Sequence, residues 1–222
     1  MEQIREKIGI NGFTLKWIAI ITMVIDHTGM IFFPYNNIPR IIGRIAFPIF
    51  CFLLVEGFLH THDRKKYALR LLLFAVISEG PFDLAIYLAI GQTNVFAQQN
   101  VFFTLLLGLL LLILIEHSPK VWWRMLMTVL ARMAAYFFMT DYNMMGVLLI
   151  LAFYVFRTSI IGQAASLAFL DWGMFGGTQN FAIISILPIW LYNGQRGPKM
   201  KYFFYVFYPA HLLLLCFIRI FI

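Results

Sequence analysis

Apolar runs dominate this chain and leave little room for any fold other than a bundle of membrane-crossing helices. An α-helix rises about 1.5 Å per residue, so about 20 apolar residues are needed to cross a bilayer. About nine runs approach that length, at 14–33, 42–60, 69–90, 101–115, 121–139, 144–157, 159–172, 179–193 and 203–221. Only 12% of the residues are charged, whereas a soluble domain has about 25%. The sequence therefore predicts an all-α, polytopic integral membrane bundle of about nine transmembrane helices, built by residues 1–222 as a single domain.

The same residues argue against several other classes of protein. The start of the chain, MEQIREKIGINGF, is charged, and no small-residue cleavage site follows the first apolar run, so we expect that span to be retained. Cys51 and Cys216 both lie in apolar runs, which suits neither a disulfide framework nor a zinc site. The chain has no GxSxG, HExxH or Walker sequence, so serine, zinc and ATP-dependent chemistry lack support and no metal is expected.

Basic residues predict how the spans are oriented. Lysine and arginine concentrate in cytoplasmic loops. Here they fall in alternate loops, which contain Arg5, Lys7 and Lys16, then Arg64, Lys65, Lys66 and Arg70, then Lys120 and Arg124, then Arg157, and finally Arg196, Lys199 and Lys201. The N-terminus is therefore predicted to be cytoplasmic, with Arg40, Arg44 and Arg219 as exceptions to the rule. Because topology accounts for most of the net charge of +7, we expect membrane lipid as a partner and no nucleic acid.

Eight ionisable side chains fall within or near the predicted spans, namely Asp26, His27, Arg44, Glu56, Glu79, Asp83, Arg132 and His211. A charged group at the centre of a bilayer costs roughly 2.5–3.5 kcal/mol, so such groups face the bundle interior or a wet cavity and usually pair. One interpretation is simple ion pairing between helices, for example of Arg44 with Glu79 or Glu56. Taken together, the set favours a polar functional cavity.

Lys16 and His27 are placed on one face of the first span. They are eleven residues apart, and eleven steps of about 100° return to nearly the same side of a helix. His27 would lie roughly 16 Å further along the axis, past the bilayer midplane. Asp26 points about 100° away, so we expect it to contact a neighbouring helix rather than orient the imidazole.

Two further stretches carry candidate site residues. Gly80 and Pro81 interrupt the third apolar run between Glu79 and Asp83, and a broken helix at membrane depth is tolerated where it is buried or lines a cavity. We therefore predict a helix break that forms part of a site, with an ordinary proline kink as the alternative. In the last span, Tyr208 and His211 are three residues apart and share a face.

The chemistry that this pattern suits is proton transfer during acyl transfer. Imidazole titrates near neutral pH, and its uncharged form can take a proton from an amine or hydroxyl as that group attacks an acyl carbon. The basic residues at the predicted cytoplasmic rim could hold the phosphates of a cytosolic donor. Their alternative role is orientation of the spans alone.

At these residues the chain resembles two related families. Lys16 and His27 match the Arg/Lys-x10-His motif of the acyltransferase-3 membrane acyltransferases. The whole chain looks like the TraX family through MVIDHTG (23–29), GRIAFPIFCFLLVEGFLHT (43–61), RLLLFAVISEGPFDL (70–84), NVFFTLLLGL (100–109), TDYNMMGV (140–147), LYNGQRGP (191–198) and YPAHL (208–212). Acyltransferase-3 proteins usually have ten spans rather than nine, so residue roles are carried over only to Lys16 and His27.

The resemblance implies transfer of an acyl group, normally acetyl from acetyl-CoA, to an amine or hydroxyl on a membrane-associated or extracytoplasmic acceptor. Pilin modification within the family points to a peptide N-terminus, and the broader superfamily points to a glycan. The motif implies that His27 is the base. The candidate groups are His27, Asp26 and Glu79 for catalysis, Lys16, Arg44, Arg64, Lys66 and Arg70 for the cofactor, and Asp83, Asp141, Tyr208 and His211 for the acceptor.

Two other readings compete with a multi-pass acyltransferase of the inner (plasma) membrane. Buried carboxylates and a broken helix are also features of ion- or proton-coupled transporters, although we see no inverted repeat in the sequence. A noncatalytic assembly factor for a surface polymer is the third reading. The sequence is compatible with a homo-oligomer.

Overall fold

The computed structural model describes residues 9–94, 97–175 and 177–222, and every regular element within them is helical. The elements are α2 (Gly12–Phe32), α3 (Asn37–Gly43), α4 (Ala46–His60), α5 (Arg64–Ile90), α6 (Val101–Glu116), α7 (Val121–Phe137), α8 (Asn143–Val155), α9 (Ile160–Leu170), η1 (Asp171–Phe175), η2 (Gly177–Ser185), α10 (Ile186–Trp190) and α11 (Lys201–Phe221). The all-α prediction is confirmed. Arg5 and Lys7, which contributed to the predicted orientation of the N-terminus, lie outside the described residues.

Within the described residues, four helical segments are long and apolar enough to cross a membrane. They are Gly12–Phe32, Asn37–His60, Arg64–Ile90 and Tyr202–Phe221. The second of these joins α3 to α4. The helices Val101–Glu116 and Asn143–Val155 are apolar but shorter. The chain is thus a multi-pass membrane protein, while the count of nine crossings exceeds the number of segments that meet this length.

Short polar caps begin several of these helices. Asn11 accepts a hydrogen bond from the backbone N–H of Thr14 at the start of α2, and Asp63 accepts one from Lys66 at the start of α5. Asn100 caps α6 in the same way through the N–H of Phe102. Each cap satisfies a donor that the first helical turn leaves without an intrahelical partner.

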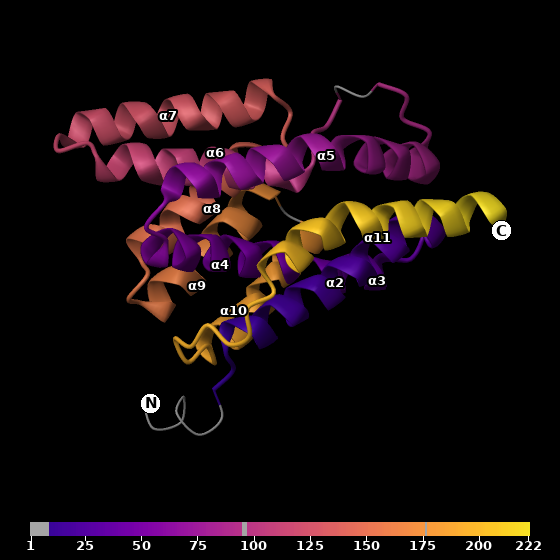
Figure 1. Ribbon diagram of the computed structural model, residues 1–222, viewed down its shortest axis with the longest axis horizontal. Helices are drawn as coiled ribbons and strands as arrows, with labels where there is room; N and C mark the ends of the chain where they lie inside the picture. Colours follow the sequence, from indigo (N-terminus) through magenta and orange to yellow (C-terminus); the bar gives the residue numbers. More distant parts are fainter. Residues whose placement is uncertain (1–8, 95–96, 176) are drawn as a thin grey trace.

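Helices α2 and α11 lie side by side and run in the same direction (Figure 1). Trp17 packs against Phe204 near the start of both helices, and His27 meets His211 further along. In contrast, α4 runs past α2 in the opposite direction. Gly43, just before the start of α4, lies against Asp26 in the second half of α2, and residues near the end of α4 lie near the start of α2. This three-helix arrangement holds the polar residues of α2 inside the bundle.

The predicted break at Gly80 and Pro81 is wrong, because α5 continues from Arg64 to Ile90 with Pro81 inside it. Proline lacks an N–H, so one helical hydrogen bond is lost there. A membrane helix can keep its course through a proline when its surroundings accommodate the change. Apart from the two adjacent residues and the backbone of α5 itself, no heavy atom lies within 4 Å of a Cβ built on Gly80, so no neighbouring helix packs closely at this point.

The predicted span at 179–193 also differs from the structure. The 3₁₀-helix η2 occupies Gly177–Ser185 and the five-residue α10 follows at Ile186–Trp190. Gly177 has φ of +59°, a left-handed conformation that favours glycine. The hydropathy of the stretch predicted a regular span, but not the tighter pitch of its backbone.

Candidate functional site

A cavity of about 380 Å³ opens beside the second half of α2, and we call it the histidine cavity. Its polar lining includes Asp26, His27, Arg40, Arg44, Gln98 and Asp141, which come from α2, α3, the junction before α4 and two loops. The remaining lining is mostly apolar. Four of the six polar side chains were candidates from sequence alone, and the fold brings them together from positions 26 to 141.

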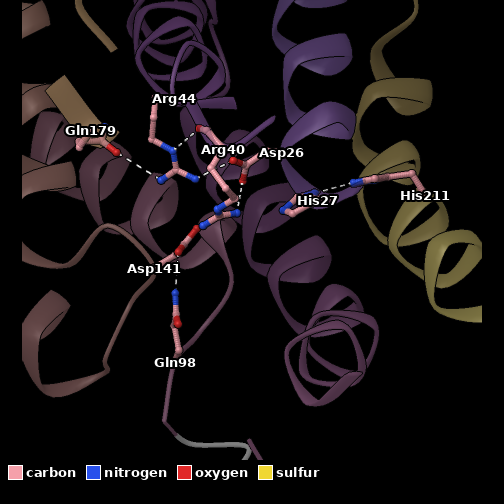
Figure 2. Close-up of polar contacts among 8 residues, drawn as sticks. All are labelled: Asp26, His27, Arg40, Arg44, Gln98, Asp141, Gln179 and His211. Carbon is pink, nitrogen blue, oxygen red and sulfur yellow. Dashed lines mark hydrogen bonds and ion pairs between the residues drawn. The ribbon is translucent and has the colours of Figure 1, made fainter. Parts of the chain in front are cut away.

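An ion-pair cluster forms one wall of the histidine cavity (Figure 2). Asp26 accepts one hydrogen bond from Arg40 Nη1 at 2.7 Å and another from Arg44 Nη2 at 2.8 Å. Arg44 also donates to the Arg40 carbonyl at 3.1 Å and to Gln179 Oε1 at 3.3 Å. Asp26 therefore contacts a neighbouring helix, as predicted, but the pairing of Arg44 with Glu79 or Glu56 is wrong.

Asp141 faces the same cavity from the turn between α7 and α8. Gln98 Nε2 donates a hydrogen bond to its carboxylate at 2.7 Å. Burial raises the pKa of Asp141 from 3.8 to about 6, while Arg44 and the hydrogen bond from Gln98 act in the opposite direction. The neighbouring Tyr142 stacks on Phe47, with ring centroids 3.4 Å apart and an interplanar angle of 5°. This contact holds the turn against α4.

His27 is half-buried at the edge of the histidine cavity and touches α11 on its other side. Its Nδ1 lies 2.8 Å from Nε2 of His211, and Nδ1 of His211 lies 2.9 Å from the carbonyl oxygen of Phe207. His211 itself is buried, with 6% of its surface exposed. His211 thus contacts one side of the His27 imidazole, and the other side is open to the histidine cavity.

A second cavity, of about 360 Å³, lies beside the first half of α2, and we call it the lysine cavity. Its polar lining includes Lys16, Glu56, His60, Tyr67, Tyr192, Arg196 and Tyr205. The Lys16 ammonium lies 5.3 Å from the centre of the Phe204 ring. Lys16 and His27 therefore both point toward α11, which confirms that they share one face of α2.

The two cavities adjoin each other inside the bundle. Met23, Phe50, Val101 and Tyr208 line both of them. Met23 is one helical turn before His27, and Tyr208 places its ring 6.0 Å from the imidazole. A molecule that entered through the lysine cavity would therefore reach the boundary beside His27.

Several predicted site residues lie elsewhere among the described residues. Glu79 hydrogen-bonds Asn100 and lines neither cavity. Asp83 lines a third hollow of about 330 Å³, which shares Gln98 with the histidine cavity. His211 stands behind His27 and lines neither of the two cavities.

The basic residues of the predicted cytoplasmic rim also lie partly away from the cavities. Arg64 pairs with Glu116 and stacks on Phe58, while Lys66 forms an ion pair of 3.0 Å with Asp63. Neither side chain lines the lysine cavity within the described chain. Arg70 lies over the ring of Tyr67, just outside the cavity wall, with its guanidinium carbon 5.5 Å from the ring centre. Arg44 belongs to the ion-pair cluster. Of the predicted cofactor group, only Lys16 therefore lines the lysine cavity.

Sequence reasoning missed Arg40 and Arg196 as site residues. Arg196 lies in the loop before α11 and shares the lysine cavity with Lys16. Arg40 was treated only as an exception to the positive-inside rule. That exception was the available signal, because two arginines on the uncharged side of a membrane protein need a carboxylate partner, which Asp26 supplies.

Comparison with known proteins gives a consistent result. The TraX protein family matches residues 11–219. A probable fimbrial assembly protein, FimC of serogroup H1 from Dichelobacter nodosus, is 32% identical over an alignment that covers 97% of this chain and 98% of that protein. An uncharacterised protein of Rickettsia prowazekii strain Madrid E is 44% identical over 28% of this chain and 23% of its own length. No solved structure matches.

Proposed function

This chain belongs to the TraX family, and we propose that it is an integral-membrane acyltransferase that uses cytosolic acetyl-CoA as its donor. The acceptor would be an amine or hydroxyl on a membrane-associated or extracytoplasmic molecule. The observation that carries the proposal is that two cavities meet beside one histidine. Such an arrangement lets a donor and an acceptor on opposite sides of a membrane react without either of them crossing it.

The lysine cavity suits the donor. Lys16 and Arg196 can provide charge-assisted hydrogen bonds to phosphate groups at its mouth. Its wall is largely apolar further in, with Leu53, Leu54 and Leu71 among its residues. An extended thioester arm would run along that wall and bring the acetyl carbonyl to the boundary that Met23 and Tyr208 form.

The histidine cavity suits the acceptor. An uncharged amine or a hydroxyl would attack the thioester carbonyl carbon, forming an N–C or O–C bond as the C–S bond breaks. His27 would take the proton from the attacking atom and deliver it to the departing CoA thiolate. Asp26 would hold Arg40 and Arg44 in place rather than accept a proton, since both of its oxygens are engaged.

The relative from Dichelobacter nodosus bears on the acceptor. Its name describes a probable fimbrial assembly protein, and it matches this chain over nearly the full length of both. We therefore place the acceptor among the molecules from which surface fibres are built, with a pilin-like peptide N-terminus first and a glycan second.

The proposed topology has nine crossings, with the N-terminus in the cytoplasm and the C-terminus outside, in the inner (plasma) membrane. The parallel course of α2 and α11 supports it, since their starts lie on one side of the bundle. Lys16 and Arg196 then face the cytosol, where acetyl-CoA is found. The short segments α9, η1, η2 and α10 would make the seventh and eighth crossings together.

The test is donor binding and turnover by the purified protein. We expect acetyl-CoA to raise the thermal unfolding temperature and the thioester to be hydrolysed slowly when no acceptor is added. His27→Ala should keep the stabilisation and lose the hydrolysis. An ion- or proton-coupled transporter would show neither effect, and that result would reject the proposed activity.

A further inference from the structure

We propose that His211 is the positioning residue that fixes the tautomer of His27 and leaves Nε2 of His27 as the proton-accepting atom. The inference rests on the proposed function for its chemical meaning, but its structural part can be tested without any reaction. It starts from two distances that link three groups in a line, from Phe207 through His211 to His27.

The first link assigns a proton. A backbone carbonyl oxygen can only accept a hydrogen bond, so Nδ1 of His211, at 2.9 Å from the oxygen of Phe207, must carry the hydrogen. A neutral imidazole has one N–H and one bare nitrogen. Nε2 of His211 is therefore the bare nitrogen and must act as an acceptor.

The second contact fixes the tautomer of His27. Its Nδ1 lies 2.8 Å from the bare Nε2 of His211, so Nδ1 of His27 is the donor and carries the hydrogen. Nε2 of His27 is then the bare nitrogen. This arrangement satisfies both contacts while the pair has no net charge, which a membrane interior favours.

The bare nitrogen lies on the side where an acceptor would bind. Figure 2 shows the His27 ring with one nitrogen turned to His211 and the other turned toward the side on which Arg40 and Asp141 lie. His27 lines the histidine cavity, and His211 lines neither cavity among the described residues. His211 thus acts through His27 and does not touch a substrate, which differs from the acceptor-binding role predicted from the sequence.

Packing holds His211 in the orientation that this role needs. Its ring stacks on Phe207 at an interplanar angle of 12°, and Tyr208 meets it edge-on at 5.6 Å. Only 6% of its surface is exposed. Rotation of the ring would break the hydrogen bond to the Phe207 carbonyl and leave a buried N–H without a partner, which is costly.

The consequence for the reaction is a defined path for one proton. Nε2 of His27 takes the proton of the attacking amine or hydroxyl, and the cation so formed keeps its Nδ1–H hydrogen bond to His211. The same proton leaves from Nε2 to the CoA thiolate. With the opposite tautomer, Nε2 would already carry a hydrogen and could not accept another.

Nitrogen-15 spectroscopy tests the tautomer directly. Protein labelled with ¹⁵N-histidine is purified, and the signal of His27 is identified by its loss in His27→Gln. We expect the Nδ1 of His27 to be protonated and its Nε2 to be bare in the wild-type protein. A protonated Nε2 with a bare Nδ1 would overturn the inference.

Two variants of His211 test its role. His211→Gln retains an oxygen that can accept from Nδ1–H of His27, whereas His211→Phe keeps the ring shape but has no acceptor. We expect His211→Phe to lower kcat by more than tenfold with the KM for acetyl-CoA unchanged, since a histidine base in the wrong tautomer can cost up to about 10⁴ in kcat. We expect His211→Gln to recover much of that loss.

Equal kcat for His211→Phe and the wild type would overturn the positioning role. So would a His27 tautomer that His211→Phe leaves unchanged. Failure of the proposed function looks different, because the wild-type protein would then turn over no acetyl-CoA whatever the ¹⁵N spectrum shows.

Discussion

Gly43 lies so close to Asp26 that a methyl group at position 43 would overlap the Asp26 carboxylate. The missing side chain is what allows the junction before α4 to approach α2 and bring Arg44 within 2.8 Å of Asp26. We expect Gly43→Ala to destabilise the protein by about 1–3 kcal/mol, the usual cost of overpacking a buried site. Thermal unfolding in detergent measures the change.

The matched control is Gly173→Ala, at an exposed position of η1, where a Cβ would meet no atom within 4 Å outside the neighbouring residues and the helix backbone. Alanine is favoured over glycine in a helix by roughly 0.5–1 kcal/mol, so this variant should be as stable as the wild type or more so. If both alanine variants unfolded at the wild-type temperature, the close approach of Gly43 and Asp26 would not matter for stability.

The two arginines that bind Asp26 should contribute unequally. Arg44 donates to Asp26, Gln179 and the backbone, and only 14% of its side-chain surface is exposed. Arg40 donates to Asp26 and its side chain is 34% exposed. We expect Arg44→Ala to cost on the order of 3–5 kcal/mol, as breaking a buried pair does, and Arg40→Ala about 1 kcal/mol. Chemical unfolding of both variants in one detergent gives the comparison, and a larger loss for Arg40→Ala would contradict it.

How far the sequence could predict this arrangement depends on the kind of interaction. Helical periodicity correctly placed Lys16 and His27 on one face and turned Asp26 away from it, because that geometry is internal to one helix. It could not identify Asp26, rather than Glu79 or Glu56, as the partner of Arg44. That choice depends on which helices are neighbours, which is a tertiary property that local spacing does not contain.

Backbone irregularities were predicted poorly for a related reason. Pro81 is a helix breaker in water, yet α5 continues through it, because the environment of a membrane helix can absorb one lost hydrogen bond. The apolar stretch at 179–193 was assigned to a regular span, but it contains η2 and α10. Hydropathy identifies apolar segments in both places and says little about the geometry of their backbone.

Asp141 should make stability depend on pH. Burial raises its pKa from 3.8 to about 6, so the folded protein binds this proton more tightly than the unfolded chain does. The resulting stabilisation is complete below pH 4 and is lost as the pH rises through 6. Within that window the stabilisation falls by at most about 1.4 kcal/mol for each pH unit. We expect the unfolding temperature of Asp141→Asn, relative to wild type, to increase from pH 4 to pH 6.5, and a constant difference would contradict the assignment.

Lys16 and Arg196 should act on donor binding and not on the chemical step. Both line the lysine cavity, and loss of one charge-assisted hydrogen bond of about 1.5 kcal/mol corresponds to roughly a tenfold change in affinity. We expect Lys16→Ala and Arg196→Ala to raise the KM for acetyl-CoA about tenfold with little change in kcat. Lys66→Ala is the control, because Lys66 pairs with Asp63 away from the cavity and should leave KM unchanged.

The boundary between the cavities can be tested with a larger side chain. Met23 lines both cavities, so Met23→Phe should narrow the passage, leave acetyl-CoA binding intact and lower transfer by about tenfold or more. Ile21→Phe, on the exposed face of the same helix, is the control and should keep wild-type activity. If Met23→Phe transferred acetyl groups at the wild-type rate, the donor would have to reach its acceptor by another route.

The most direct measurement of the central claim uses everted membrane vesicles, in which the cytosolic face is outermost. Acetyl-CoA with a radioactive acetyl group is added to vesicles that contain the wild-type protein or an equally abundant, folded His27→Ala variant, and label in acid-stable acceptor material is counted. The account predicts incorporation with the wild-type protein from the cytosolic face and none with His27→Ala. Equal labelling by the two proteins would contradict it.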